Sequence, residues 1–178
     1  PLEKSATSWN FVGPKRTVWR AEHRPNQQVA PWQVNIYAFA VAPSNPTILF
    51  AASETGEVYK TTDKGLNWDP VMTYNWGGAG RAIAIHPTNP SVVFVSTNTD
   101  IIRSTDGGMA WASVLTVSGL SANSLEFSPD GGTIIAGTGQ GARRSTDGGS
   151  TWSNQLSGEI MDVAFRPGDN RTVYALLR

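Results

Sequence analysis

The chain has 178 residues with 18 glycines and 11 prolines, and only 16% of its residues are charged. This composition favours short strands joined by tight turns, and the length is sufficient for one hydrophobic core. The formal net charge is zero, which argues against nucleic acid as a partner. No apolar run reaches the roughly 20 residues that span a bilayer, so we expect no membrane insertion. The absence of cysteine excludes a disulfide framework and a catalytic thiol.

One octapeptide recurs along the chain, at residues 61–68, 104–111 and 145–152. Each copy has the form Ser/Thr-Thr-Asp-x-Gly-x-x-Trp. Its aspartates stand at positions 63, 106 and 147, so the repeat is 43 and then 41 residues long. A repeat of this length filled with short β-rich runs is typical of a four-stranded propeller blade.

A second marker keeps the same spacing and ends at Pro43, Pro87, Pro129 and Pro167. Two and four residues before each proline the side chain is large and apolar, and most of the alternate positions are small. This period of two predicts a strand with one bulky face and one face that a neighbouring sheet can approach. Each proline is followed by a turn and a second β-rich run, so the octapeptide falls between the third and fourth strands.

We therefore predict an all-β fold, a β-propeller of four-stranded antiparallel blades with about 3.5 blades present. Residues 1–34 form an irregular lead-in and residues 35–178 a partial propeller. The expected blades are residues 35–72, 80–115, 122–155 and an incomplete 160–178. Because closed propellers usually have about four to eight blades, we expect a fragment of a larger propeller whose first partner is the rest of its own longer chain.

The octapeptide chemistry suits a structural role in a hairpin loop. Aspartate can accept hydrogen bonds from nearby backbone N–H groups, glycine tolerates a positive φ, and tryptophan can pack beneath the loop. The residues given this structural role are Asp63, Gly65, Trp68, Asp106, Gly108, Trp111, Asp147, Gly149 and Trp152.

The octapeptide resembles the Asp box, or BNR repeat, of sortilin-like VPS10 propellers, the photosystem II assembly factor, xyloglucanases and sialidases. The third copy matches the pattern fully, whereas Asn67 and Ala110 stand where it prefers threonine, which should weaken one side-chain bond in each loop. Residues 9–14 resemble the mature start of large secreted Bacteroidetes proteins. That resemblance implies an extracellular or cell-surface location, reached by type IX secretion, with the periplasm as the alternative.

Loops at one end of the blades supply the first candidate binding site. In a propeller of such blades, the turns that join the first and second strands lie on the same face as the octapeptides. We therefore expect ligand contacts on the opposite face. There Tyr74, Trp76 and Arg81 combine aromatic rings with a cation, which suits a sugar or a protein partner. The alternative is a glycine-rich crossover with a tryptophan packed between blades.

Two carboxylates supply the second candidate, because Glu126 and Asp162 occupy inner-strand positions that carry small residues in other repeats. Both are expected to face the central channel. Paired carboxylates perform glycoside hydrolysis, although channel-facing polar residues can simply meet water. The two histidines, His23 and His86, lie far apart in the sequence, so we expect no metal site, and no cofactor is expected.

The sequence favours a non-catalytic secreted or cell-surface module that binds protein or polysaccharide, or acts as a scaffold, within a larger exported protein. The alternative is a sialidase- or xyloglucanase-like glycoside hydrolase whose catalytic residues lie mostly outside this sequence. The Arg-Ile-Pro motif of sialidases is absent. No catalytic residue is assigned. Whether the chain is an enzyme is left open, and the sequence favours a protein that is not one.

Overall fold

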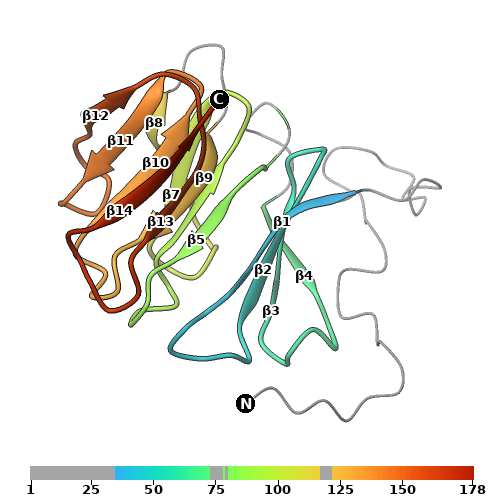
Figure 1. Cartoon of the computed structure of the whole chain (residues 1–178). Helices are drawn as coiled ribbons and strands as arrows, with labels where there is room; N and C mark the ends of the chain where they lie inside the picture. Colours follow the sequence, from blue (N-terminus) through green and yellow to red (C-terminus); the bar gives the residue numbers. More distant parts are fainter. Residues whose placement is uncertain (1–34, 73–77, 79, 117–121) are drawn as a thin grey trace, which may run out of the picture.

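A computed structural model describes residues 35–72, 78, 80–116 and 122–178. These residues form fourteen antiparallel strands in four sheets. The sheets stand side by side as blades, with the first strand of each on the inside of the arc (Figure 1). In this described part, no helix is long and apolar enough to cross a membrane.

Three blades have four strands and one has two, and sequence order equals spatial order in each. Blade 1 contains β1 (Ile36–Val41), β2 (Leu49–Ser53), β3 (Val58–Thr61) and β4 (Asp69–Met72). Blade 2 contains β5 (Ile83–Ile85), β6 (Val93–Ser96), β7 (Asp100–Ser104) and β8 (Ala112–Thr116). Blade 3 contains β9 (Ala122–Phe127), β10 (Ile134–Thr138), β11 (Gly141–Ser145) and β12 (Ser153–Ser157). Blade 4 contains β13 (Ile160–Phe165) and β14 (Val173–Leu177). The predicted fold class is confirmed.

The blades pack face to face because each has one face with small inner-strand residues and one with large ones. Ala38 and Ala40 of β1 lie against the cluster that holds Ile85 of β5. In the same way Ala84 of β5 lies in the cluster of Leu125 on β9. The alternation in the sequence therefore places a sheet close to its neighbour, as a strand period of two requires.

Fully buried side chains from the second and third strands form most of the core between blades. Phe50 and Val58 lie between blades 1 and 2, Phe94 and Ile101 between blades 2 and 3, and each is 0% exposed. Complete burial of such a side chain contributes about 1.5–3 kcal/mol. The core is thus a series of inter-blade layers.

Candidate functional site

The three octapeptide loops connect the third and fourth strands of their blades and share one end of the molecule with the proline turns. Lys64 N donates to the Thr47 carbonyl at 3.1 Å, and Gly107 N donates to the Ser91 carbonyl at 2.9 Å. These bonds tie each octapeptide loop to the strand-one-to-two turn of its own blade. The predicted sharing of one face is therefore seen in blades 1 and 2.

The third loop shows the full set of contacts within an octapeptide. Ser145 Oγ donates to Asp147 at 2.8 Å and accepts from Gly149 N at 2.8 Å. Asp147 also accepts from Thr151 N at 2.9 Å and from Thr151 Oγ1 at 2.6 Å, and Trp152 Nε1 donates to the Gly149 carbonyl at 3.1 Å. Gly149 has a φ of 89°, a conformation that favours glycine.

The first loop corrects one expectation from the sequence. Asn67 does not weaken its loop, because its Nδ2 donates to Asp63 Oδ2 at 2.7 Å and replaces the threonine hydroxyl. In the second loop Ala110 offers only its backbone N–H to Asp106, at 3.0 Å, as the sequence predicts. The second loop therefore lacks the side-chain hydrogen bond to the aspartate that Asn67 and Thr151 make in the other two.

These contacts set the ionisation of the loop aspartates. Hydrogen bonds from Thr151 lower the pKa of Asp147 from 3.8 to about 2. The Asn67 backbone N–H, with Thr61 and the Asn67 side chain, lowers the pKa of Asp63 to about 2. Because their oxygens are occupied by loop donors, these carboxylates are engaged in holding their own hairpins, as the structural assignment of the octapeptide requires.

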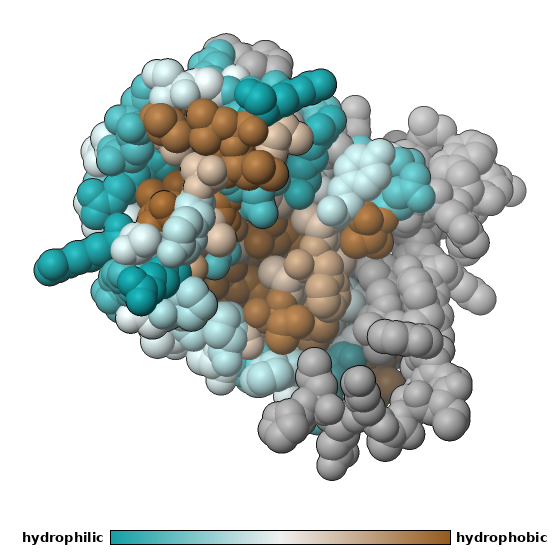
Figure 2. Space-filling model, viewed as in Figure 1, coloured by the Kyte–Doolittle hydropathy of each residue, from teal (hydrophilic) through white to brown (hydrophobic). Residues whose placement is uncertain are grey.

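A hollow of about 500 Å³ is lined by the inner strands of all four blades. Figure 2 shows apolar surface gathered near the centre of this view. The residues that line the hollow come from the ends of β1, β5, β9 and β13 and from the turns that follow these strands. They are Ala40, Val41, Pro43, Ile83, Ala84, Ile85, Pro87, Leu125, Glu126, Phe127, Ser128, Pro129, Phe165, Arg166 and Pro167.

The two inner-strand carboxylates lie on adjacent strands, β9 and β13. Ser124 Oγ donates to Asp162 Oδ1 at 2.7 Å, and Val163 N donates to the same oxygen at 2.9 Å. Both carboxylate side chains reach solvent. Burial by the surrounding protein, followed by repulsion from Asp162, raises the pKa of Glu126. Asp162 is thus the second cause of the raised pKa of Glu126, and Glu126 belongs to the lining of the hollow.

Of the three loop candidates, Arg81 alone falls within the described residues. Tyr74 and Trp76 fall outside the described residues. Arg81 is exposed and precedes β5, where its backbone N donates to Ser96 Oγ at 3.2 Å. Arg81 is absent from the lining of the hollow, which lies at the proline end of the inner strands.

Arg166 is a lining residue that the sequence argument missed as a candidate. It occupies the repeat position that holds Ala42 in blade 1 and Ser128 in blade 3, and it is an exposed basic residue in the lining, opposite in charge to Glu126. A comparison of the charge, as well as the size, of the side chains at equivalent repeat positions would have identified Arg166. In the described part of the chain, no group of three or more His, Cys, Asp or Glu side chains could hold a metal ion.

The repeated sheets and their loops define this chain as part of a β-propeller. No family model matches the chain. Its sequence is 27% identical over 99 residues to a vacuolar protein sorting/targeting protein 10 from Ajellomyces capsulatus (strain H143), which amounts to 56% of this chain and 6% of that protein. The predicted resemblance to VPS10-type propellers is thereby confirmed.

Solved structures give the same fold. An ancestral GH74 enzyme aligns with a TM-score of 0.69 at 24% identity, over 79% of this chain and 21% of the enzyme. The Niastella koreensis GH74 enzyme aligns with a TM-score of 0.67 at 25% identity, over 79% of this chain and 25% of that enzyme. The structure of YCF48 bound to D1 peptide aligns with a TM-score of 0.56 at 19% identity, over 81% of this chain and 50% of the YCF48 chain. The chain thus spans a quarter or less of either GH74 enzyme.

Proposed function

We propose that this chain is a non-catalytic binding module of a larger exported protein, located outside the cell or on its surface. Its contact surface is the inner-strand hollow, which takes a segment of protein or polysaccharide. The observation that carries the proposal is that all four blades contribute to this one hollow of about 500 Å³. Pockets of this size, mostly apolar with a few convergent polar groups, are the usual form of a binding site.

The chemistry of the lining suits recognition. Val41, Ile83 and Phe127 supply apolar contact area, while Glu126 and Arg166 supply one charge of each sign. Polar groups of this kind fix the orientation of a ligand on an apolar surface. The similar propeller YCF48 is described as bound to a peptide, which supports the protein arm of the proposal.

The experiment is a paired screen of glycan and peptide arrays with the full chain. A bound ligand is then titrated against the wild type, Glu126→Ala and Arg166→Ala. We expect at least one saturable ligand whose binding both substitutions weaken, with Arg143→Ala on the third strand of blade 3 as the charge-matched control. Binding that survives both substitutions, or that the control weakens equally, contradicts the assignment to the hollow.

A second candidate is a glycoside hydrolase, favoured by the carboxylates of Glu126 and Asp162 on adjacent strands and by the likeness to GH74 enzymes. Hydrolysis of a glycosidic bond needs two carboxyl groups with separated pKa values. One similar structure is a GH74 xyloglucanase, so xyloglucan is the first substrate to test. Release of reducing ends that Glu126→Gln abolishes would favour this candidate over the binding module.

A further inference from the structure

His86 stands in the turn between β5 and β6, beside the inner-strand hollow. Its two neighbours in the chain, Ile85 and Pro87, line the hollow, and so does Phe127 of β9. The imidazole ring meets the Phe127 ring at an angle of 67°, with the ring centroids 5.2 Å apart. A change in the position of the His86 ring would therefore reach the hollow through three residues of its lining.

The His86 ring accepts hydrogen bonds from its own turn. Asn89 N donates to His86 Nδ1 at 3.2 Å, and Thr88 N donates to the same atom at 3.3 Å. Because a backbone N–H group can only donate, Nδ1 carries no proton in this arrangement. The ring is thus neutral, with its hydrogen on Nε2, and an imidazole nitrogen closes the turn.

The other three blades close the equivalent turn with a backbone carbonyl, which belongs to the residue before the proline. The pairs are Asn45 N with the Ala42 carbonyl at 3.1 Å, Gly131 N with the Ser128 carbonyl at 2.8 Å, and Asp169 N with the Arg166 carbonyl at 3.0 Å. A backbone carbonyl does not titrate in this range, whereas histidine ordinarily changes its charge between about pH 5 and 8. Among these four turns, that of blade 2 is therefore the one whose closing bond a proton can break.

A carboxylate lies beside the His86 ring, in the equivalent turn of blade 3. A Cβ placed on Gly131 would lie 2.5 Å from Cε1 of the ring, so a glycine is needed for the ring to approach this turn. The preceding residue is Asp130. Its pKa is lowered chiefly by the hydrogen bond from Ser128 Oγ and in smaller part by the charge of His86. A protonated His86 would therefore have an anion next to it.

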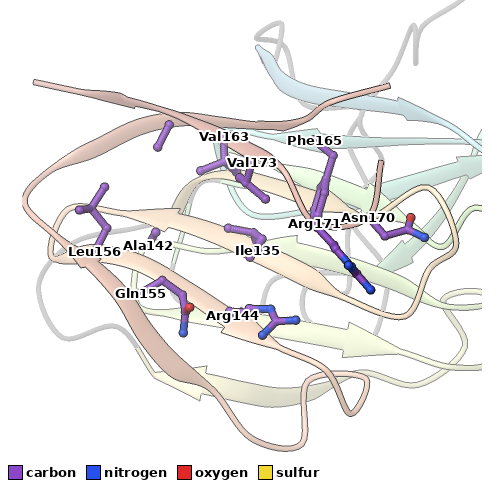
Figure 3. Close-up of a pocket in the computed structure, with 11 residues that line it drawn as sticks. Ile135, Ala142, Arg144, Gln155, Leu156, Val163, Phe165, Asn170, Arg171 and Val173 are labelled. Atoms are coloured by element: carbon purple, nitrogen blue, oxygen red, sulfur yellow. The ribbon is translucent and has the colours of Figure 1, made fainter. Parts of the chain in front are cut away.

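The Asp130 turn is held from its other side. Asn170, in the turn of blade 4, accepts a hydrogen bond from Asp130 N through Oδ1 at 3.1 Å. Figure 3 shows Asn170 among the residues that line a second hollow, of about 420 Å³, between blades 3 and 4. Glu126 projects from the opposite face of β9 to Phe127, because successive side chains of a strand alternate. Asp130 is thus the charged group that the elements packed against the ring present to it.

We infer that protonation of His86 reshapes the inner-strand hollow and so makes its ligand binding depend on pH. The proton occupies Nδ1, and the hydrogen bonds from Thr88 N and Asn89 N break. The imidazolium turns toward the Asp130 carboxylate and leaves its contact with Phe127. The hollow then binds its ligand more weakly at about pH 5.5 than at about pH 7.5. This regulation rests on the proposed binding function.

The first test needs no ligand and uses NMR of the full chain at about pH 7.5 and about pH 5.5. The protection factor of the Asn89 amide against hydrogen exchange should fall about tenfold on acidification, as the loss of one hydrogen bond implies. The Phe127 ring resonances should shift over the same pH range. His86→Ala, which supplies the residue that blade 1 has at Ala42, should remove both effects. His23→Ala, at the second histidine of the chain, should retain them.

Two results of this comparison overturn the inference. One is an Asn89 protection factor that is the same at both pH values in the wild type. The other is a pH dependence of the Asn89 amide or the Phe127 ring that survives His86→Ala.

The second test concerns the charge of Asp130. Asp130→Asn keeps an oxygen for Ser128 Oγ and Gly132 N but removes the negative charge, so the shift of the Phe127 resonances should require a lower pH. Asp169→Asn, in the equivalent turn of blade 4, is the matched control and should leave the shift where it is in the wild type. An equal displacement in both variants, or none in Asp130→Asn, overturns the inference.

The last test reads the glycan and peptide arrays at both pH values. Spots that the wild type binds at about pH 7.5 should lose most of their signal at about pH 5.5, and His86→Ala should keep that signal. Equal signals at both pH values in the wild type overturn the inference. Arrays without any bound spot contradict the proposed function alone, because the NMR comparison decides the rearrangement at His86 without a ligand.

Discussion

Asp147 accepts two hydrogen bonds from Thr151, one from the backbone N–H at 2.9 Å and one from the hydroxyl at 2.6 Å. The bonds close the loop on itself and stabilise the ionised carboxylate. The same arrangement, with an amide in place of the hydroxyl, joins Asp63 to Asn67. Each octapeptide loop is therefore a local device that holds a third and fourth strand together.

The first prediction concerns acid. Asp63 and Asp147 have a pKa of about 2 in the folded chain against an ordinary value of 3.8. Since the unfolded chain takes up these protons at higher pH, their stabilising contribution is complete above about pH 4 and is lost as the pH falls toward 2. Urea unfolding followed between pH 5 and pH 2 should show this loss. Asp147→Asn should reduce the slope of the free energy of unfolding against pH. An unchanged slope in this variant would contradict the hydrogen-bond pattern.

The second prediction restores a bond that one loop lacks. Ala110→Thr places a hydroxyl where Thr151 has one, within reach of Asp106, and should raise the thermal midpoint by a few degrees. Thr151→Ala should lower it by a similar amount. Differential scanning calorimetry of the two variants measures both effects. The two changes in thermal midpoint should have opposite signs. A lower midpoint in both variants would mean that the loops are not equivalent.

The third prediction tests tryptophan packing beneath a loop. Trp111 belongs to the layer between blades 1 and 2, and its Nε1 donates to the Gly108 and Val71 carbonyls. Trp111→Ala should destabilise the fold by about 3–5 kcal/mol, as large core truncations do. Met109, in the same loop, is 86% exposed, so Met109→Ala should change little. Chemical denaturation of both variants compares them, and equal losses would place the stabilisation outside the tryptophan layer.

The fourth prediction concerns the inner-strand carboxylates. Burial and Asp162 together raise the pKa of Glu126. Asp162→Asn should therefore lower the pKa of Glu126, though burial should still keep it above the ordinary value. Carbon-13 NMR titration of the Glu126 carboxyl measures this directly. A pKa that stays the same in the variant would show that the two groups are not coupled.

The repeat spacing in the sequence predicted the propeller, because each repeat corresponds to one blade. The structural role given to the octapeptides rested on contacts within about eight residues of each strand pair. Contacts between blades were beyond that reasoning. Lys60 and Arg103 bond to loops 47 and 45 residues away, and only the stacking of blades shows that they do. Asn67 was misjudged because an amide can replace a hydroxyl when the backbone brings it to the same oxygen.

The candidate site was harder to predict for a related reason. Size substitutions on the inner strands singled out Glu126 and Asp162, and the structure brings them to adjacent strands. The hollow itself depends on how four strand ends converge, which no single repeat encodes. The loop residues Tyr74 and Trp76 remain predictions.

We propose above that the inner-strand hollow binds its ligand without catalysis. The most direct test of this proposal is one titration of the ligand found by the array screen, followed by calorimetry and by product analysis of the same sample. We expect saturable heat of binding that Glu126→Ala and Arg166→Ala both diminish, with the ligand recovered intact. Cleaved ligand in the wild type and intact ligand with Glu126→Gln would contradict it.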